Sequence, residues 1–480
     1  MSGPGITGVG GYAPNTRLSA TEVGDAWGQF EASGIEQTAV PDADEDTLTM
    51  GYEAAKRALD AADTDGAALE SLAFATTMPP MAETEMTVHL SELLDLPDTA
   101  DLQLYTGSTR AGLQALADAL VESSATPALV VASDRPQGEL DDAVEQAAGA
   151  GAAAFVVDQD GPMTVRDHAT YAESFQGTRF RPTGSDRTEA LDITAFDREA
   201  FTSTISAAIA RLDVDVEILD AAAIQAPDGG LPYRAGAAAG IDASLIENAA
   251  TVHELGDIGA ASVPLSLARA LASGSETVLA AAFGSGAVAE AMTLAVDQSS
   301  NAPSVALAID GDREVSYTDY LRQRGEITSG SPDGGGAYVS VPAWKRTLPQ
   351  RYRLEAGRCP ACEALNFPPS GACSGCHELV EYEPVQLDST ATVEAVTVIS
   401  QGGAPPEFVE QQARTGDYTV AIVAIDGPDG DTASIPAQVV ETDPGTLEIG
   451  DRVEFTVRRV YVQEDVIRYG MKFRPLRDDL

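Results

Sequence analysis

Two kinds of hydrophobic pattern alternate over residues 1–327. Apolar positions that recur every three or four residues predict amphipathic helices, and short, uniformly apolar runs predict buried strands. In the first half of this region the patterns predict helices at 46–62 and 109–121, and strands at 71–77, 128–133 and 151–157. In the second half they predict helices at 198–212 and 260–271, and strands at 218–225, 277–283 and 287–296.

The order and spacing of these elements repeat between the two halves. A repeat of this kind indicates a duplicated structural unit. Helices that alternate with uniformly apolar strands imply sheets covered on both faces. We therefore predict an α/β fold built from two similar halves, residues 1–165 and residues 166–327.

The pattern changes after residue 327. Glycine and serine are frequent from there on, which predicts a flexible linker at 328–341. A short helix is expected at 344–354, and we assign 342–384 to this helix and a cysteine-bearing module.

The last segment, residues 385–480, has the pattern of a small all-β domain. Runs rich in β-branched residues alternate with turn residues, and predict strands at 390–400, 418–425, 433–440 and 452–462. About five strands in so short a segment suit a small barrel, most simply an OB-fold.

The charge balance is strongly acidic. The chain has 75 acidic and 29 basic residues and a formal net charge of −46, and its only lysines are Lys56, Lys345 and Lys472. Binding of nucleic acid through a basic surface is therefore not expected. An acidic surface poor in lysine indicates a source organism from a salt-rich habitat, because concentrated salt screens the repulsion between the protein's negative charges. An ordinary acidic protein is the alternative, and neither origin specifies a function.

The chain has no segment that predicts export or membrane insertion. No run of about 18 apolar residues is present, so no transmembrane helix is expected. The first residues lack the basic and apolar regions of a signal peptide. We expect a cytoplasmic protein that does not contact membranes.

The four cysteines are spaced as two Cys-x2-Cys pairs separated by ten residues: Cys359, Cys362, Cys373 and Cys376. Each pair lies in a short turn that directs two thiolates toward one point, so together they predict a closed tetrahedral zinc site. Four thiolate ligands leave no position for a substrate, and the zinc is therefore expected to be structural. Two disulfides are the alternative, but they require an oxidising compartment.

Residues 1–327 resemble the thiolase superfamily, in particular archaeal hydroxymethylglutaryl-CoA synthases and 3-oxoacyl-ACP synthase III. The stretches that carry the resemblance are Gly5-Ile-Thr-Gly-Val-Gly-Gly-Tyr-Ala-Pro14, Asp44-Glu-Asp-Thr-Leu-Thr-Met-Gly51, Val131-Ala-Ser-Asp134, Gly149-Ala-Gly-Ala-Ala-Ala-Phe155, Gly256-Asp-Ile-Gly-Ala-Ala-Ser262 and Phe283-Gly-Ser-Gly286. The resemblance implies a thiolase-like fold.

Residues 342–480 resemble the zinc-ribbon/OB-fold family that accompanies thiolase-type enzymes. The matching stretches are Arg358-Cys359-x-x-Cys362, Phe367-Pro-Pro369, Gly450-Asp-Arg-Val453 and Tyr469-Gly-Met-Lys-Phe473. The two resemblances cover nearly the whole chain, in the order expected of an enzyme-like unit followed by an accessory module.

Active members of the thiolase superfamily use a cysteine at the start of a buried helix, together with His and Asn or two His residues. The resemblance aligns these positions with Thr106, Gln225 and Asp257, and an assisting Glu with Thr77. No cysteine precedes Cys359. Threonine is a poor nucleophile without an adjacent base, and glutamine cannot accept a proton. We therefore expect that Claisen condensation has been lost.

The resemblance thus predicts an acyl-CoA-binding protein that keeps the pocket and the homo-oligomer surface. Its ribbon and barrel would bind a partner thiolase or synthase, and fusion would raise the effective concentration of the assembled parts. An active acyltransferase of the hydroxymethylglutaryl-CoA synthase type, with a remodelled site and a place in mevalonate or lipid metabolism, is the alternative. A different reaction that uses Thr106, Ser108 or Tyr105 is another. Oligonucleotide binding by the barrel is a third hypothesis, which fold alone does not support.

A few basic residues and histidines are further candidates. Arg179 and Arg181 stand out in so acidic a chain and are predicted to contact CoA phosphates, with ion pairing to local carboxylates as the alternative. His253 precedes the expected active-site loop and is either a displaced base or a solvated loop residue. His89 and His168 are expected to be structural or exposed.

Overall fold

The computed structural model describes residues 3–121, 125–191, 194–297, 300–327, 339–400, 412–428 and 430–476. It divides into two compact units. The first comprises Met1–Asp42 and Asp46–Tyr317, and the second comprises Ala43–Glu45 and Thr318–Leu480. Most of the linker predicted at 328–341, namely 328–338, lies outside the described residues.

A ten-stranded sheet forms the centre of the first unit, in the order β5-β4-β6-β7-β1-β8-β11-β10-β9, with β12 beside β1. Its strands are β1 Gly5–Tyr12, β4 Ser71–Ala75, β5 Asp101–Tyr105, β6 Ala128–Asp134, β7 Gly151–Asp158, β8 Met163–Phe175, β9 Ala221–Ile224, β10 Thr277–Gly284, β11 Gly286–Val296 and β12 Ser304–Ala308. A small second sheet contains β2 Thr16–Ser19, β3 Gln37–Val40 and β13 Arg313–Glu314.

The strand pairing repeats on the two sides of the β1–β8 contact. On one side β4 is parallel to β6, which is antiparallel to β7, which is antiparallel to β1. On the other side β9 is parallel to β10, which is antiparallel to β11, which is antiparallel to β8. This repetition confirms the duplicated α/β fold class.

The helices predicted from the hydrophobic pattern are present. They are α2 Thr47–Ala62, α4 Ala111–Val121, α6 Thr194–Ile209 and α10 Ser262–Ala272. The start of α2 is fixed by a capping box: the Asp46 carboxylate accepts the Thr49 N–H at 3.1 Å, and the Asp46 N–H donates to Thr49 Oγ1 at 2.9 Å. The shorter helices of this unit are α1 Ala20–Trp27, α3 Met86–Leu93, α5 Ala143–Ala147, α7 Leu231–Ala238, α8 Ala243–Glu247 and α9 Val252–Leu255.

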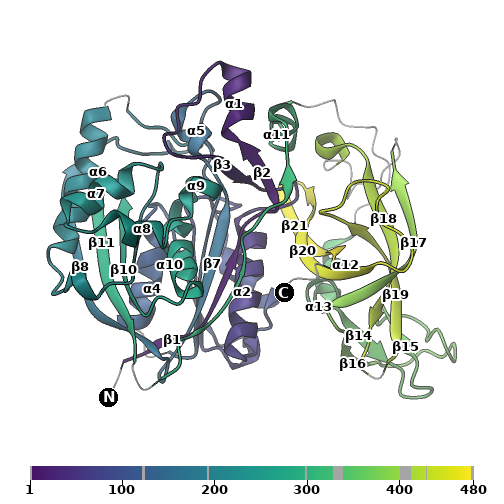
Figure 1. Cartoon of the computed structure of the whole chain (residues 1–480). Helices are drawn as coiled ribbons and strands as arrows, with labels where there is room; N and C mark the ends of the chain where they lie inside the picture. The colour runs from purple at the N-terminus through teal and green to yellow at the C-terminus, as the bar shows by residue number, and fades with distance from the viewer. Residues whose placement is uncertain are drawn as a thin grey trace. The chain divides into compact units, whose positions relative to one another are not determined.

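Helices α4 and α10 are central to an extensive hydrophobic core of the first unit, together with strands from both halves (Figure 1). Helix α2 packs on β1 and β7, and this packing requires small residues in β1. A Cβ atom at Gly10 would lie 2.1 Å from the Ala54 carbonyl oxygen. Gly8 and Gly10 therefore let helix α2 approach the strand closely.

The second unit contains a three-stranded ribbon sheet and a closed five-stranded barrel, as predicted. The ribbon strands are β14 Glu355–Arg358, β15 Leu365–Asn366 and β16 Glu383–Gln386. The barrel strands are β17 Thr390–Ile399, β18 Tyr418–Asp426, β19 Thr432–Val439, β20 Arg452–Gln463 and β21 Val466–Pro475. The barrel encloses an apolar core that includes Val393, Val423, Val453 and Phe473.

The single helix expected at 344–354 is instead two short helices, α12 Val341–Arg346 and α13 Leu348–Arg353. The break lies at Thr347, just before Pro349. Proline has no N–H and fits only the first turn of a helix, so it starts a new helix here. Helix α11, Tyr317–Gln323, begins at the boundary between the two units.

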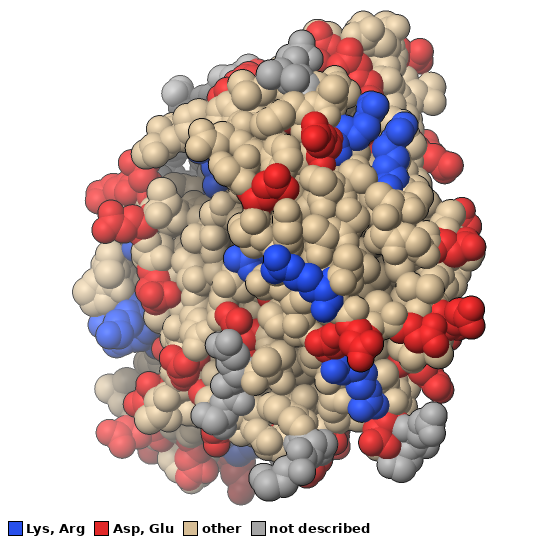
Figure 2. Space-filling model, turned by 90° about the vertical axis from the view of Figure 1, so that its left-hand side faces the viewer, with Lys and Arg blue, Asp and Glu red and all other residues tan. Residues whose placement is uncertain are grey.

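Acidic side chains are distributed widely over the surface. On the face drawn in Figure 2 they are interspersed with fewer basic side chains and do not form a single patch. Among the residues that the structure describes, no helix combines the length and apolar character needed to span a bilayer.

Candidate functional site

The four cysteines of the ribbon lie in two equivalent turns. In each turn the N–H that follows the second cysteine donates to the carbonyl of the first: Glu363 to Cys359 at 2.8 Å, and His377 to Cys373 at 2.9 Å. Glu363 and His377 both adopt the left-handed conformation, with φ of 62° and 63°. The two turns therefore present their sulfur atoms in the same way.

The sulfur atoms of the four cysteines all lie within 4.8 Å of one another. The Sγ atoms of Cys359 and Cys376 are 3.8 Å apart, and those of Cys362 and Cys373 are 3.5 Å apart. A tetrahedral zinc ion with Zn–S bonds of about 2.3 Å requires S···S distances of about 3.8 Å. The residues present therefore fit a four-thiolate zinc site.

Polar groups around the Cys373 sulfur favour its ionised form. Hydrogen bonds from the backbone N–H groups of Cys376 and Gly375 lower the pKa of the Cys373 thiol to about 6. The Asn366 side chain donates to the same sulfur at 3.6 Å and accepts the Ser374 N–H at 2.8 Å. Asn366 thus orients one ligand, a contribution that the spacing of the cysteines alone does not predict.

In the first unit, Gln225 and Asp257 both contact the loop that leads into α10. Gln225 Nε2 donates to the Gly259 carbonyl at 2.9 Å, and Asp257 Oδ1 accepts the Gly259 N–H at 2.9 Å. Both side chains are 2% exposed. The structure therefore brings these two predicted site residues together around one glycine.

Asp257 also forms an ion pair with Arg179, whose Nη1 contacts Asp257 Oδ2. Arg181, from the same loop, donates to the Thr77 carbonyl and contacts the Met78 sulfur. Arg179 and Arg181 therefore contact Asp257 and Thr77, two of the positions aligned with the family's active-site residues. Their contact with CoA phosphates stays a prediction.

A buried carboxylate, Asp134, also contacts the loop that leads into α10. Its Oδ2 accepts hydrogen bonds from the Ala260 N–H at 2.8 Å and from Thr77 Oγ1 at 2.7 Å. Burial raises the pKa of Asp134 above its ordinary value, although these hydrogen bonds and the charge of Arg179 oppose the shift. In the sequence Asp134 stands out only as part of the Val131-Ala-Ser-Asp134 motif, because nothing near it along the chain indicates its partners.

Thr106 follows β5 and is exposed. Among the described residues, no hydrogen bond joins Thr106 to Gln225 or Asp257. Ser108 is half-buried and its Oγ accepts the Arg110 N–H at 3.3 Å, while Tyr105 donates to Asp118 at 2.9 Å.

The histidines have partners that the sequence does not reveal. His253 contacts the Tyr233 hydroxyl at 2.9 Å and the Gly34 carbonyl at 2.6 Å. His168, on β8, pairs with Glu290 on β11 at 2.9 Å, and the hydrogen bond to Glu290 raises the pKa of His168. His89 lies on α3.

Family models match two segments of the second unit. Residues 346–381 match the "ChsH2, rubredoxin-like zinc ribbon domain", and residues 384–458 match the "ChsH2, C-terminal OB-fold domain". These matches agree with the ribbon and the barrel that the structure contains.

The remainder of the chain is similar to curated hydroxymethylglutaryl-CoA synthases. The protein of Methanobrevibacter smithii is 27% identical over 342 residues, which cover 67% of this chain and 99% of that protein. The protein of Thermococcus onnurineus is 35% identical over 164 residues, which cover 34% of this chain and 47% of that protein.

Solved structures of low sequence identity share the fold. A crystal structure of a hydroxymethylglutaryl-CoA synthase complexed with CoA has a TM-score of 0.57 at 18% identity, over 71% of this chain and 96% of that chain. The 3-oxoacyl-(acyl carrier protein) synthase III of Pseudomonas aeruginosa has a TM-score of 0.54 at 18% identity, over 63% of this chain and 99% of that chain. About two thirds of the chain is thus similar to hydroxymethylglutaryl-CoA synthases and has a thiolase-like fold, and the segments that follow match the ChsH2 zinc-ribbon and OB-fold models.

Proposed function

We propose that this chain binds acyl-CoA in its thiolase-like unit without forming an acyl-enzyme, and acts as a partner subunit for a thiolase or synthase. The observation that carries the proposal is the ion pair between Asp257 and Arg179, together with a threonine at the position aligned with the nucleophilic cysteine. Relatives that share the fold are described in complexes with CoA.

The chemistry of these side chains argues against acyl transfer. A threonine hydroxyl has a pKa far above 7 and needs a positioned base to attack a thioester. Gln225 is not a base, and Asp257 already accepts hydrogen bonds from Gly259 and Arg179. A carboxylate at this position would also repel the negative charge that develops on the thioester oxygen.

One observation favours a second candidate function, an active acyltransferase with a remodelled site. Asp134 is buried and has a raised pKa, and its hydrogen bond to Thr77 Oγ1 at 2.7 Å joins a carboxylate to a hydroxyl. A carboxyl group with a raised pKa is a candidate for acid–base chemistry. The two functions differ in whether a covalent acyl group appears on the protein.

We expect calorimetric titration with CoA in high salt to give saturable binding, and Arg181→Ala to weaken it at least several-fold. Its guanidinium is the predicted phosphate contact, and charge-assisted bonds to phosphate are strong. Arg198→Ala is the matched control, because Arg198 is an exposed arginine on α6. A wild-type protein that does not bind CoA would refute the proposal; equal affinity in both variants would refute the role of Arg181.

The thiolase-like unit is also expected to form a homodimer, through the open edge of β5. Among the described strands, β5 pairs only with β4. The Asp101 N–H donates to Glu70 and the Tyr105 carbonyl accepts from Thr76, so the backbone groups of Leu102 and Leu104 point to the open edge. An open edge of this kind is a template for pairing with another chain.

Light scattering in high salt should give a dimer for the wild-type chain and a monomer for Leu104→Pro. Proline removes the N–H that faces the edge but keeps the hydrogen bonds to β4. Leu104→Ala keeps that N–H and should remain dimeric. A monomeric wild type, or a dimeric Leu104→Pro variant, would contradict pairing at this edge.

A further inference from the structure

The hairpin of β20 and β21 carries buried basic side chains on the face that points away from the barrel core. Thr456 and Lys472 are register partners, and Arg458 follows on the same face opposite Gly470. The alternate residues, such as Val453 and Phe473, belong to the barrel core. Arg458 is 0% exposed and Lys472 is 1% exposed. Buried cations need specific partners, because isolated charges are very costly to remove from water.

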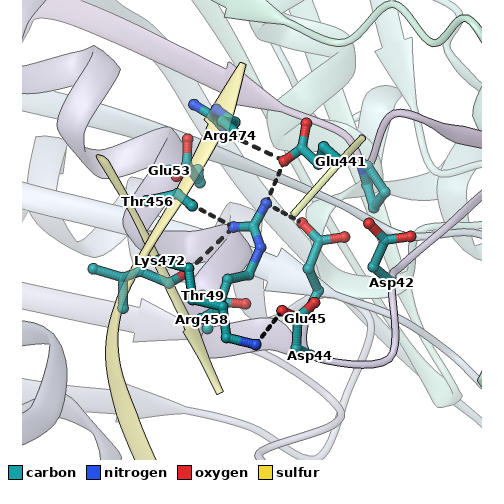
Figure 3. Close-up of polar contacts among 12 residues, drawn as sticks. Asp42, Asp44, Glu45, Thr49, Glu53, Glu441, Thr456, Arg458, Lys472 and Arg474 are labelled. Atoms are coloured by element: carbon teal, nitrogen blue, oxygen red, sulfur yellow. Dashed lines mark hydrogen bonds and ion pairs between the residues drawn. The ribbon is translucent and has the colours of Figure 1, made fainter. Parts of the chain in front are cut away.

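These partners include a separate stretch of chain, residues 43–45, which belongs to the second unit (Figure 3). Lys472 Nζ lies 2.6 Å from Asp44 Oδ2, and Arg458 Nη2 lies 3.2 Å from Glu45 Oε1. The backbone also takes part, since the Arg459 N–H donates to the Asp44 carbonyl at 2.9 Å. The hairpin therefore contacts two successive acidic side chains and one peptide group of this stretch.

Carboxylates of the barrel itself set the geometry of the same face. Glu441 Oε1 lies 2.5 Å from Arg458 Nη2 and 3.4 Å from Arg474 Nη1, and Glu454 lies 2.5 Å from Arg474 Nε. Arg458 is thus held between Glu441 and Glu45. A guanidinium fixed in this way offers its N–H groups in defined directions, which suits recognition of a carboxylate.

The burial of this cluster distinguishes it from ordinary surface pairing. The Lys56–Asp60 pair has the same kind of partners at 2.8 Å, but its side chains are 52% and 62% exposed. Salt screens such an exposed pair, whereas buried pairs are screened much less. Buried ion pairs add little net stability but can confer specificity. The cluster therefore has the properties of a recognition site that keeps working in concentrated salt.

We infer that the outer face of the β20–β21 hairpin is a recognition site for an acidic Asp-Glu segment, and that residues 43–45 of this chain occupy it as a built-in ligand. The inference does not rest on the proposed acyl-CoA function.

The test uses the full-length chain with its own segment disabled by the substitutions A43G/D44S/E45G. A fluorescent peptide with the sequence of residues 40–48 should bind this variant saturably, by fluorescence anisotropy in high salt. Wild-type chain should bind it at least ~100-fold more weakly, because the tethered segment competes at an effective concentration in the millimolar range. A peptide with Asn and Gln in place of Asp44 and Glu45 should not bind.

Adding Lys472→Met to the triple variant should abolish peptide binding, while adding Lys345→Met should not, since Lys345 is an exposed lysine on α12. The inference is overturned if the folded triple variant does not bind the peptide, or if wild type binds it equally well. If the triple variant does not fold, amide hydrogen exchange of single variants of the otherwise unchanged chain tests the inference instead. Lys472→Met should raise exchange at residues 43–46 at least tenfold relative to Lys345→Met, and equal exchange would overturn the inference.

Discussion

Cys359→Ser and Cys373→Ser variants are expected to lose the single zinc ion predicted for each chain, and with it the folded ribbon. The ribbon strands β14, β15 and β16 are four, two and four residues long and provide little core of their own. In modules this small the free energy of zinc binding, about 10–16 kcal/mol in zinc-finger peptides, is the free energy of folding. Metal analysis and thermal unfolding, with and without chelator, measure both effects.

His377→Ala is the control for the zinc prediction. His377 follows the last cysteine and is exposed, and its N–H rather than its side chain takes part in the second turn. This variant should keep one zinc per chain. Undiminished zinc in both serine variants would show that the four cysteines are not the ligands.

Lys472→Met is expected to lower the free energy of unfolding by about 3–5 kcal/mol, the usual cost of leaving one partner of a buried ion pair uncompensated. The uncompensated group is Asp44, which is 4% exposed. Lys56→Met removes a lysine from an exposed pair and should cost less than about 1 kcal/mol. Denaturant unfolding in high salt compares the two variants.

The double variant Asp44→Asn/Lys472→Met should recover much of the lost stability, because no buried charge then remains unpaired in this pair. Burial alone would raise the pKa of Asp44, but the charges of Lys472 and Arg458 and the hydrogen bond from Lys472 lower it below its ordinary value. Its contribution to stability is therefore full above the unfolded pKa of about 3.9 and is lost as the pH falls through the lower folded value. A double variant no more stable than Lys472→Met would contradict this account.

The hydrophobic pattern correctly predicted the helices and strands that are apolar throughout or that begin with a clear capping sequence. Helix α2 begins one residue after its predicted start, because Asp46 and Thr49 carry the capping signal in their own sequence. Strand β8, Met163–Phe175, was not predicted; its residues are mostly half-buried or exposed and lack an apolar run. Strand β21 was missed as well, because Lys472 and Arg474 are residue types usually found at exposed positions, although both are buried in this strand.

Among the candidate sites, the zinc site could be predicted from the sequence, whereas the buried ion pairs could not. The zinc ligands are close in sequence, and their spacing sufficed to predict the geometry. The ion pair of Arg179 and Asp257 joins residues 78 positions apart, and that of Lys472 and Asp44 joins residues 428 positions apart. Local periodicity carries no information about such pairs, because they depend on how distant strands and loops meet in the folded chain.

Mass spectrometry of the intact protein after incubation with acetyl-CoA tests the proposed function most directly. The account predicts no acetyl adduct and no condensation with acetoacetyl-CoA, because no reactive thiolate or positioned base is expected at Thr106. An acetyl group on Thr106 or Ser108, lost together with turnover when that residue is replaced by alanine, would contradict the account and favour an active acyltransferase.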